Sequence, residues 1–481
     1  MDVRPVLLWF RLDLRLRDNP ALCAAVATKA PVIPIFIWAP EDEAPWPPGA
    51  ASRWWLHHSL RNLQEGLGQA GSKLTIRKGP AEQVLRELVA ETQPACVFWN
   101  RRYEPALVAR DQKIKAALLA EGVAVESFNS ALLFEPWTVR TEKGHPFQVF
   151  TPFWKTCLKQ PAPAQPLRAP EKLPRPSRWP RSAAVEDLEL EPKVDWASGI
   201  RAAWQPGEAG AQRQFRRFLK GAFARYSSDR NFPGKAGTSR LSPHLHFGEI
   251  SPREIWHSLL ARQNDDNQTS IQAYLREVGW REFAYHLLFH FPFTSNAPLR
   301  KEFARFPWRR SAGDLKKWQR GRTGYPLVDA GMRELWTTGW MHNRVRLVVA
   351  SFLTKHLRIS WEEGAYWFWD TLVDADLANN TLGWQWTAGC GADAAPYFRI
   401  FNPVLQSEKF DPDGEYIRKW VPELAGLPAP WIHKPWMAPK EALEAAGVRL
   451  GEHYPLPMVA HEEARRGALA AWEQISKQSW S

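Results

Sequence analysis

The sequence predicts an α/β N-terminal domain with a Rossmann-like parallel sheet, joined by a long linker to an all-α domain. Over the first 130 residues, short apolar runs alternate with longer helical patterns, which is the order of a parallel α/β sheet. A proline-rich stretch follows, and after it the helical period dominates. A chain of 481 residues is also too long for one ordinary core. We therefore expect an α/β domain at 1–130, a linker at 131–211 and a helical domain at 212–481.

Five apolar runs mark the expected strands of the N-terminal domain. They are VLLWF from Val6, PVIPIFIW from Pro31, KLTI from Lys73, ACVFW from Ala95 and VAVESF from Val123. After the first run, Asn19 can cap a helix and Pro20 suits its first turn, so a helix is expected over ALCAAVATKA. No G-x-G-x-x-G follows a strand, so we predict no dinucleotide site in this sheet.

The linker and the helical domain differ in their local patterns. Nine prolines lie between Pro161 and Pro206, as in a connector that runs over a surface. From near Gln212 the helical period takes over, as in SIQAYLREVGWREFAYHLLFHF from Ser270, and a last helix is expected near 460–477.

Composition narrows the partners and the compartment. Lys and Arg total 63 against 51 Asp and Glu, and this net charge of +12 favours an anionic partner such as nucleic acid over an ordinary basic surface. The four cysteines form no C-x-x-C pair and the 13 histidines no metal pattern, so reduced thiols and no metal are expected. No apolar run reaches the roughly 20 residues that span a bilayer, and the N-terminus lacks a signal-peptide pattern, which predicts a cytoplasmic protein without membrane contact.

The segment DADLANNTLGWQW collects polar and aromatic groups at short spacing. On a helix, Asn380 and Trp384 lie one turn apart and share a face. Two carboxylates, Asp374 and Asp376, with an amide can hold a ribose and the edge of a flavin ring, and an indole at that range can pass an electron to it. N-capping carboxylates and core tryptophans are the alternative for this run.

Three further clusters join this segment as candidates. Glu277, Trp280 and Arg281 share a helix face, which can accept a base N–H, stack on a base and hold a phosphate. In GWMHNRVRL, Asn343 and Arg346 share a face, and Arg346 can pair with Asp374 or Asp376. GTSRLS can cradle a diphosphate with hydroxyls and backbone N–H groups. An amphipathic helix, a surface ion pair and a plain helix start are the respective alternatives.

Taken in order, these motifs resemble the cryptochrome and DNA photolyase family across nearly the whole chain. WFRLDLRLRDNPAL, at Trp9 to Leu22, looks like the N-terminal signature of the family. GTSRLSPHLHFGEISPR, WREF, GRTGYPLVDAGMRELWTTGWMHNR and DADLANNTLGWQW follow in the family's order. The resemblance is to class III cyclobutane pyrimidine dimer photolyases, the sister group of plant cryptochromes.

The resemblance implies FAD in the helical domain and a set of residues that hold it. The implied cofactor-binding residues are Tyr226, Thr238, Ser239, Arg240, Leu241, Ser242, Arg281, Asn343, Arg346, Asp374, Asp376 and Asn380. Asn380 would face flavin N5, where plant cryptochromes carry Asp and dimer-splitting photolyases carry Asn. An amide supports a reduced anionic flavin, whereas a carboxyl favours proton uptake at N5, so Asn380 implies repair.

The same resemblance implies a substrate, UV-damaged DNA, and an electron path. Residues implied to contact the damaged DNA are Glu277, Trp280, Asn343, Arg344, Trp386 and Arg399. With Glu277 and Asn380, the electron-hopping series Trp384, Trp361 and Trp308 completes the implied catalytic set. Trp367 and Trp369 could supply a branch, with core packing as the alternative.

The expected function is light-dependent repair of cyclobutane pyrimidine dimers by electron transfer from photoexcited reduced FAD, in a monomer. A methenyltetrahydrofolate antenna is implied, with a deazaflavin or no antenna as alternatives. A cryptochrome-type blue-light photoreceptor is the alternative function, and Asn380 together with the lack of a long C-terminal extension counts against it. A basic, Trp-rich DNA-binding protein without catalysis leaves the ordered flavin motifs unexplained.

Overall fold

A computed structural model describes residues 4–397 and 399–477, which pack as two compact units. The first unit comprises Met1–Gly221, Ser239–Pro292 and Val373–Ala378, and the second comprises Ala222–Thr238, Phe293–Leu372 and Asn379–Ser481. The segment Ser239–Pro292, which lies beyond the predicted linker, therefore belongs to the same unit as the sheet. The boundaries at 130 and 211 stay a prediction.

The first unit contains the predicted parallel sheet, in the order β3-β2-β1-β4-β5. Four of the five strands begin within a residue of the predicted runs. Strands β1, β2 and β4 are buried throughout, which is why their sequences are nearly continuous apolar runs. The third was predicted from Lys73 but begins at Thr75, the first residue that pairs with β2, through Ile35. The strands are β1 (Val6–Phe10), β2 (Val32–Trp38), β3 (Thr75–Lys78), β4 (Cys96–Asn100) and β5 (Ala124–Phe128).

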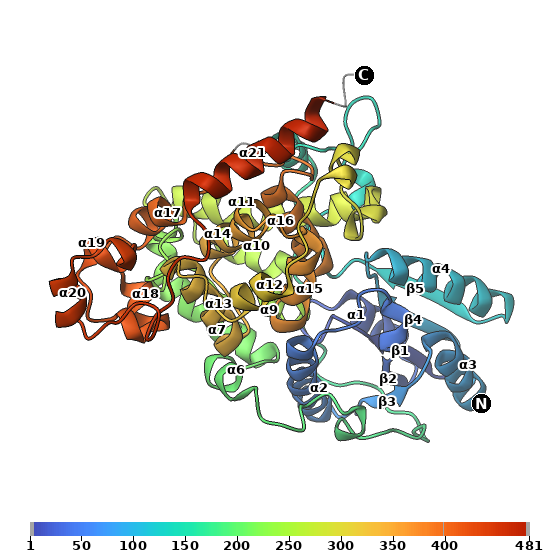
Figure 1. Cartoon of the computed structure of the whole chain (residues 1–481). Coiled ribbons are helices and arrows are strands. Elements are labelled where there is room, and N and C mark those ends of the chain that lie inside the picture. The colour runs from blue at the N-terminus through green and yellow to red at the C-terminus, as the bar shows by residue number, and fades with distance from the viewer. Residues whose placement is uncertain (1–3, 398, 478–481) are drawn as a thin grey trace. The chain divides into compact units, whose positions relative to one another are not determined.

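Helices cover this sheet (Figure 1). Apolar residues of α3 and α4 form one core with the buried side chains of the strands. Asn19 caps α1 as predicted, because its side chain accepts the N–H of Leu22 at 3.1 Å. The predicted helix is shorter than expected: α1 ends at Ala27, and Lys29 has a left-handed φ of 60°. The helices of this unit are α1 (Pro20–Ala27), α2 (Ala50–Gln69), α3 (Ala81–Thr92), α4 (Pro105–Ala120), α5 (Phe150–Cys157), α6 (Ser198–Ala203), α7 (Glu208–Lys220), α9 (Ser242–His246), α10 (Pro252–Leu260) and α11 (Gln268–His290).

The proline-rich connector is attached to the sheet rather than loose. Ala183 donates its N–H to the carbonyl of Ile76 at 3.0 Å, and Ser182 accepts the N–H of Ile76 at 2.9 Å. The connector thereby satisfies the exposed edge of β3, which would otherwise present unpaired backbone groups.

The second unit is helical, as predicted. A π-helical turn at Phe352–His356 follows α14. The last helix, α21, was expected near 460–477 and spans His461–Lys477. The helices are α8 (Tyr226–Asp229), α12 (Ala312–Gln319), α13 (Pro326–Thr338), α14 (Asn343–Ser351), α15 (Trp361–Thr371), α16 (Leu377–Ala388), α17 (Pro403–Phe410), α18 (Glu415–Trp420), α19 (Ala429–Ile432), α20 (Lys440–Ala445) and α21.

None of the helices within residues 4–397 and 399–477 is both long and apolar enough to cross a bilayer.

A fully buried carboxylate, Glu249, joins distant segments of the first unit. It accepts the indole N–H of Trp55 at 3.0 Å and the backbone N–H of Gly207 at 2.7 Å. It also contacts the hydroxyl of Ser59 and the ring of His244. A carboxylate without solvent needs such partners, because its desolvation costs several kcal/mol.

We predict that Glu249→Ala lowers the free energy of unfolding by about 3 kcal/mol or more, because buried donors lose their acceptor. Urea unfolding followed by circular dichroism measures the change. Glu65→Ala, at an exposed position of α2, is the control and should stay within about 0.5 kcal/mol of wild type. Equal stability of the two variants would contradict this role of Glu249.

Candidate functional site

Helix α11 presents the predicted triplet Glu277, Trp280 and Arg281 in the first unit. Glu277 and Trp280 are half-buried, and Arg281 is buried. The Trp280 ring stacks on Phe150 of α5, with centroids 3.8 Å apart and planes at 7°. One face of the indole is therefore covered by Phe150, so a base can stack only on the other face.

Arg281 and its neighbour Glu282 fix the loop that follows β5. Arg281 donates to the carbonyl of Ala131 at 2.6 Å, and Glu282 accepts the N–H groups of Leu133 at 2.9 Å and Phe134 at 3.1 Å. Burial raises the pKa of Glu282 to about 7, against the opposing charge of Arg281. The sequence reasoning missed Glu282, whose partners are far away in the chain.

Asp376, one of the two predicted flavin carboxylates, is buried against α11 and α9. Its carboxylate accepts the hydroxyl of Tyr285 and lies 3.5 Å from Nδ1 of His246. Burial alone would raise the pKa of Asp376, but contact with His246, the charge of Arg281 and the Tyr285 hydroxyl outweigh it and hold the pKa below its usual range. Asp376 is thus an anion at neutral pH.

Tyr285 was not predicted, although a signal existed. It lies four residues after Arg281 on α11, and the Arg281 guanidinium lies 4.9 Å from the Tyr285 ring centroid. The i, i+4 spacing would have placed both on one face.

A polar pocket in the first unit borders this group. Arg281, Tyr285 and His246 contribute to its wall. Arg102 is held there by Glu104 at 2.7 Å, and the proximity of Glu104 and Glu43 outweighs burial and raises the pKa of Arg102. The other lining residues are Leu12, Asp13, Arg15, Asn100, Arg101, Tyr103, Ser130, Ala131, Leu245, Gly248, Ile250 and Pro252.

The predicted diphosphate turn is a left-handed bend held by side chains. Arg240 has a φ of 54°, a conformation that costs energy for a residue with a Cβ. Its guanidinium lies 4.2 Å from the centroid of Trp204. Ser239 accepts the hydroxyl of Tyr274 at 2.8 Å, Leu241 is buried, and Ser242 begins α9. Thr238, which precedes this turn, belongs to the second unit.

In the second unit, α14 carries Asn343, Arg344 and Arg346 as predicted. Asn343 is exposed, and His342 caps the helix by accepting the N–H of Arg344 at 3.2 Å. Arg344 donates to Asn231 at 2.7 Å, and Arg346 donates to the carbonyl of Met341 at 2.8 Å. The pairing of Arg346 with Asp374 or Asp376 stays a prediction.

Asn380 lies on α16, where its side-chain N–H donates to the carbonyl of Ala365 in α15 at 3.1 Å. This bond fixes which way the amide points. Trp384, one turn later, is buried, and its ring centroid lies 5.0 Å from that of Phe368. A Cβ added at Gly364 would overlap the Trp384 ring. Trp386, two residues further along, is half-buried.

The predicted tryptophan series runs from buried to accessible positions. Trp384 and Trp361 are 3% and 2% exposed, whereas Trp308 is half-buried. The Trp308 ring centroid lies 4.3 Å from that of Phe306. Trp367 stacks on Trp336 at 5.9 Å and 2°, and Trp336 is 63% exposed.

Tyr226 and Arg399 are two further predicted residues, and both belong to the second unit. Tyr226 is buried under Arg230, whose guanidinium lies 5.5 Å from its ring. Arg399 is exposed, and its carbonyl accepts Nζ of Lys355 at 3.1 Å.

We predict that Glu282→Gln removes a pH dependence of stability. The folded-state pKa of about 7 lies above the ordinary 4.5, so the native state keeps a proton that the unfolded state has lost between these values. The free energy of unfolding of wild type, taken relative to that of the variant, should therefore fall by at most about 3 kcal/mol as pH rises from about 5 to about 8. Urea unfolding at several pH values tests this, and a difference that is flat with pH would refute it.

Comparisons with known proteins agree on one family. Residues 6–174 match the family described as DNA photolyase, and residues 274–474 match the FAD binding domain of DNA photolyase. The chain is 49% identical to the deoxyribodipyrimidine photo-lyase of Agrobacterium fabrum, over 99% of both chains. It is 43% identical to cryptochrome-1 of Arabidopsis thaliana, over 98% of this chain and 70% of that protein. A crystal structure of a bacterial class III photolyase from Agrobacterium tumefaciens superposes with a TM-score of 0.96 at 49% identity, covering 99% of this chain and 98% of that one.

Proposed function

This chain belongs to the DNA photolyase and cryptochrome family, and we propose that it splits cyclobutane pyrimidine dimers in DNA by light-driven electron transfer from reduced FAD. The activity is that of a carbon–carbon lyase with no net redox change. The observation that carries the proposal is the amide of Asn380, which stands where the resemblance puts Asp in plant cryptochromes.

The residues proposed to hold FAD have the chemistry that it needs. Asp374 and Asp376 are buried acidic groups, and the anionic Asp376 suits hydroxyl and N–H donors of a ribose or flavin edge. Arg281 supplies a buried cation, and the turn that begins at Thr238 supplies hydroxyls. When bound, FAD supplies the light-absorbing electron donor.

Asn380 is proposed to control the proton balance beside that cofactor. Its N–H donates a hydrogen bond to the Ala365 carbonyl, which fixes the amide. An amide also carries no proton that it can release near neutral pH. A carboxyl at the same place could exchange a proton.

Substrate contacts are proposed for residues of both units. Glu277 would accept hydrogen bonds from the flipped dimer, and Trp280 would stack on it with the face that Phe150 leaves open. Arg344, oriented by Asn231, and the exposed Arg399 would hold flanking phosphates. Trp386 and Asn343 would complete the contacts with the lesion.

The tryptophans Trp384, Trp361 and Trp308 are proposed to carry electrons inward from the surface. Their burial supports this order, because the accessible Trp308 can meet an external reductant and the two buried indoles are shielded from water.

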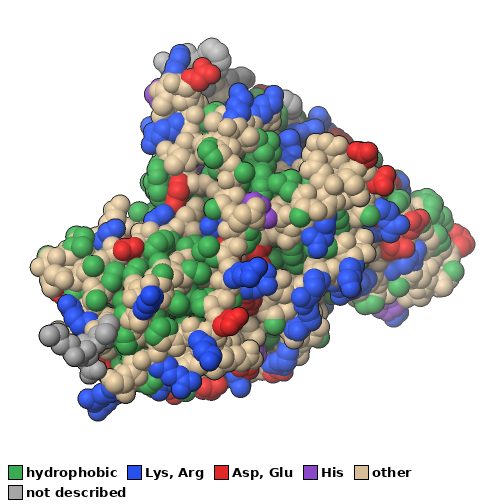
Figure 2. Space-filling view, turned by 180° about the vertical axis from the view of Figure 1, so that it is seen from behind, with side chains coloured by type: hydrophobic (Ala, Val, Ile, Leu, Met, Phe, Trp, Pro, Cys, Tyr) green, Lys and Arg blue, Asp and Glu red, His purple; other side chains and the backbone are tan. Residues whose placement is uncertain are grey.

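DNA is the proposed macromolecular partner. The chain carries a net charge of +12, and Lys and Arg side chains are spread over the face that Figure 2 shows. We also propose a monomer in the cytoplasm, where the four cysteines would stay as the free thiols that the structure contains.

A methenyltetrahydrofolate antenna is proposed in addition. This proposal rests on the family resemblance of the sequence. Near-ultraviolet absorbance of a chromophore released from the purified protein would identify a folate, and a deazaflavin is distinguished by its spectrum.

One assay distinguishes the repair function from the photoreceptor function. The protein, reduced by light, is mixed with ultraviolet-irradiated oligothymidine, and recovery of thymine absorbance under blue light is compared with a dark control. Glu277→Ala should retain FAD but lose about ten- to a hundred-fold in repair rate, the loss of a charge-assisted hydrogen bond. Gln272→Ala, on the exposed face of α11, should repair normally. No recovery with wild type that holds reduced FAD would refute repair.

A second variant addresses Asn380 itself. Asn380→Asp removes the donor to Ala365 unless the new carboxyl takes up a proton, so it should lower repair by at least about ten-fold at unchanged FAD content. The visible spectrum of the illuminated variant should also become pH dependent. Asn379→Asp adds the same charge one position earlier and should have a smaller effect. Equal repair by wild type and Asn380→Asp would remove the role given to this amide.

A further inference from the structure

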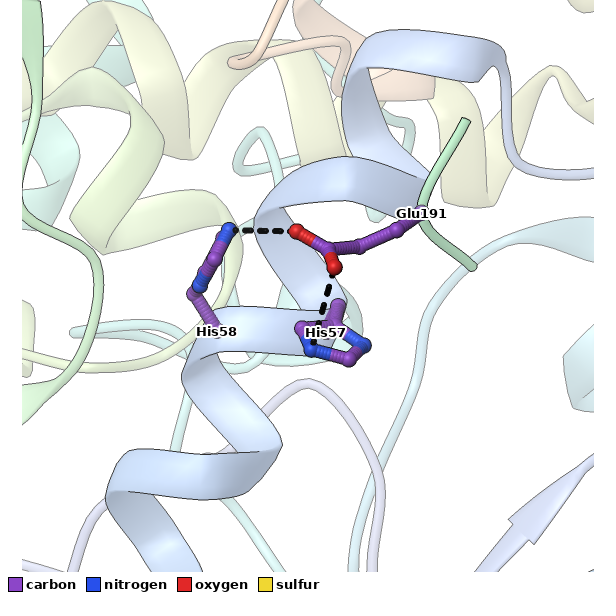
Figure 3. A group of neighbouring side chains, drawn as sticks. All are labelled: His57, His58 and Glu191. Atoms are coloured by element: carbon purple, nitrogen blue, oxygen red, sulfur yellow. Dashed lines mark ion pairs between the residues drawn. The ribbon is translucent and has the colours of Figure 1, made fainter. Parts of the chain in front are cut away.

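Two adjacent histidines of α2 lie beside a glutamate of the connector, and none of the three belongs to the proposed FAD and DNA contacts. The Nε2 atom of His58 is 3.3 Å from Oε1 of Glu191, and that of His57 is 3.8 Å from Oε2. Figure 3 shows the carboxylate between the two imidazoles. The coordinating atoms of all three residues lie within 4.8 Å of one another.

Three of the four imidazole nitrogens of this group lack hydrogen bonds among the described residues. His57 is 3% exposed, yet neither its Nδ1 nor its Nε2 has a hydrogen-bond partner there, and the buried Nε2 of His58 has none either. A buried ring nitrogen without a partner is costly, so such an atom calls for an explanation such as a bound ion.

We propose that His57, His58 and Glu191 bind a divalent transition-metal ion, with zinc as the expected occupant. Two imidazole nitrogens and one carboxylate oxygen form a donor set found in zinc sites that keep a position for water. Calcium and magnesium prefer oxygen ligands and fit it poorly.

One of the distances already fits a zinc site, and the other ligand atoms, which lie within 4.8 Å of one another, must move closer together. Ligand atoms around tetrahedral zinc are about 3.3 Å apart, given bond lengths of about 2.0–2.1 Å. The contact between His58 and Glu191 already has this length. The Glu191 and His58 side chains are 43% and 30% exposed, so they can turn toward an ion beside the buried His57.

Such an ion would tie the connector to α2. Glu191 follows Leu190, which is buried. The exposed Arg61, one turn after His57 on α2, lies 3.8 Å from Glu186 of the same connector. The exposed Lys193 and Val194 lie two and three residues after Glu191, so ion binding at Glu191 should shield the peptide bond between them.

Calorimetric titration of zinc chloride into untagged, chelator-stripped full-length protein tests the site. Wild type should bind one equivalent, and His58→Ala and Glu191→Gln should each weaken binding at least about ten-fold. These two side chains are partly exposed, which keeps the fold intact, as FAD content and circular dichroism will verify. His145→Ala, at an exposed histidine of the same unit, is the matched control and should bind as wild type does.

Two further readouts separate a built site from surface binding. Cobalt should give the visible absorption of a tetrahedral site in wild type and lose it in Glu191→Gln. Zinc should slow tryptic cleavage after Lys193 in wild type and not in His58→Ala. Absence of zinc binding by wild type, or equal binding by all variants, would overturn the proposal.

Discussion

The carboxylate of Glu249 is the contact on which the first unit's arrangement depends, because it is fully buried and cannot rely on water. Its partners come from α2, from the residue before α7 and from α9. An anion in such a place is stable only if all of these segments meet around it. The fold therefore fixes α9, and with it the end of the turn that carries Ser239 and Arg240, through a residue that has no part in the chemistry. The same carboxylate orients α2, which carries His57 and His58.

Helix α11 shows the same principle at the site itself. Its buried residues Arg281 and Glu282 hold the loop after β5, and Tyr285 holds Asp376. Its half-buried residues Glu277 and Trp280 are thereby presented at defined places. A helix whose inner face is fixed by ionic hydrogen bonds positions its outer face more precisely than apolar packing alone, since such bonds are directional.

Local patterns predicted the strands and the first helix cap, but not the contacts between distant segments. Continuous apolar runs identify β1 and β4 because both faces of a parallel sheet are covered, and Asn19 with Pro20 is a local signal for a helix start. Glu249, Glu282 and Glu191 carry no such signal. Each acts through groups that are far away in the chain, so only the fold brings them together. The motifs around Asn380 were recognisable because their residues lie within a few turns of one another.

The packing around position 380 bears directly on the role proposed for Asn380 in the proposed repair function. Helix α16 packs closely against α15 through Trp384, whose ring occupies the space where a Cβ at Gly364 would lie. The Ala365 carbonyl then requires a donor at that position. An amide provides one without a titratable proton, whereas a carboxyl provides one only when it is protonated. At the proposed flavin site, the packing of α15 and α16 would thus convert the choice between Asn and Asp into a choice of proton chemistry.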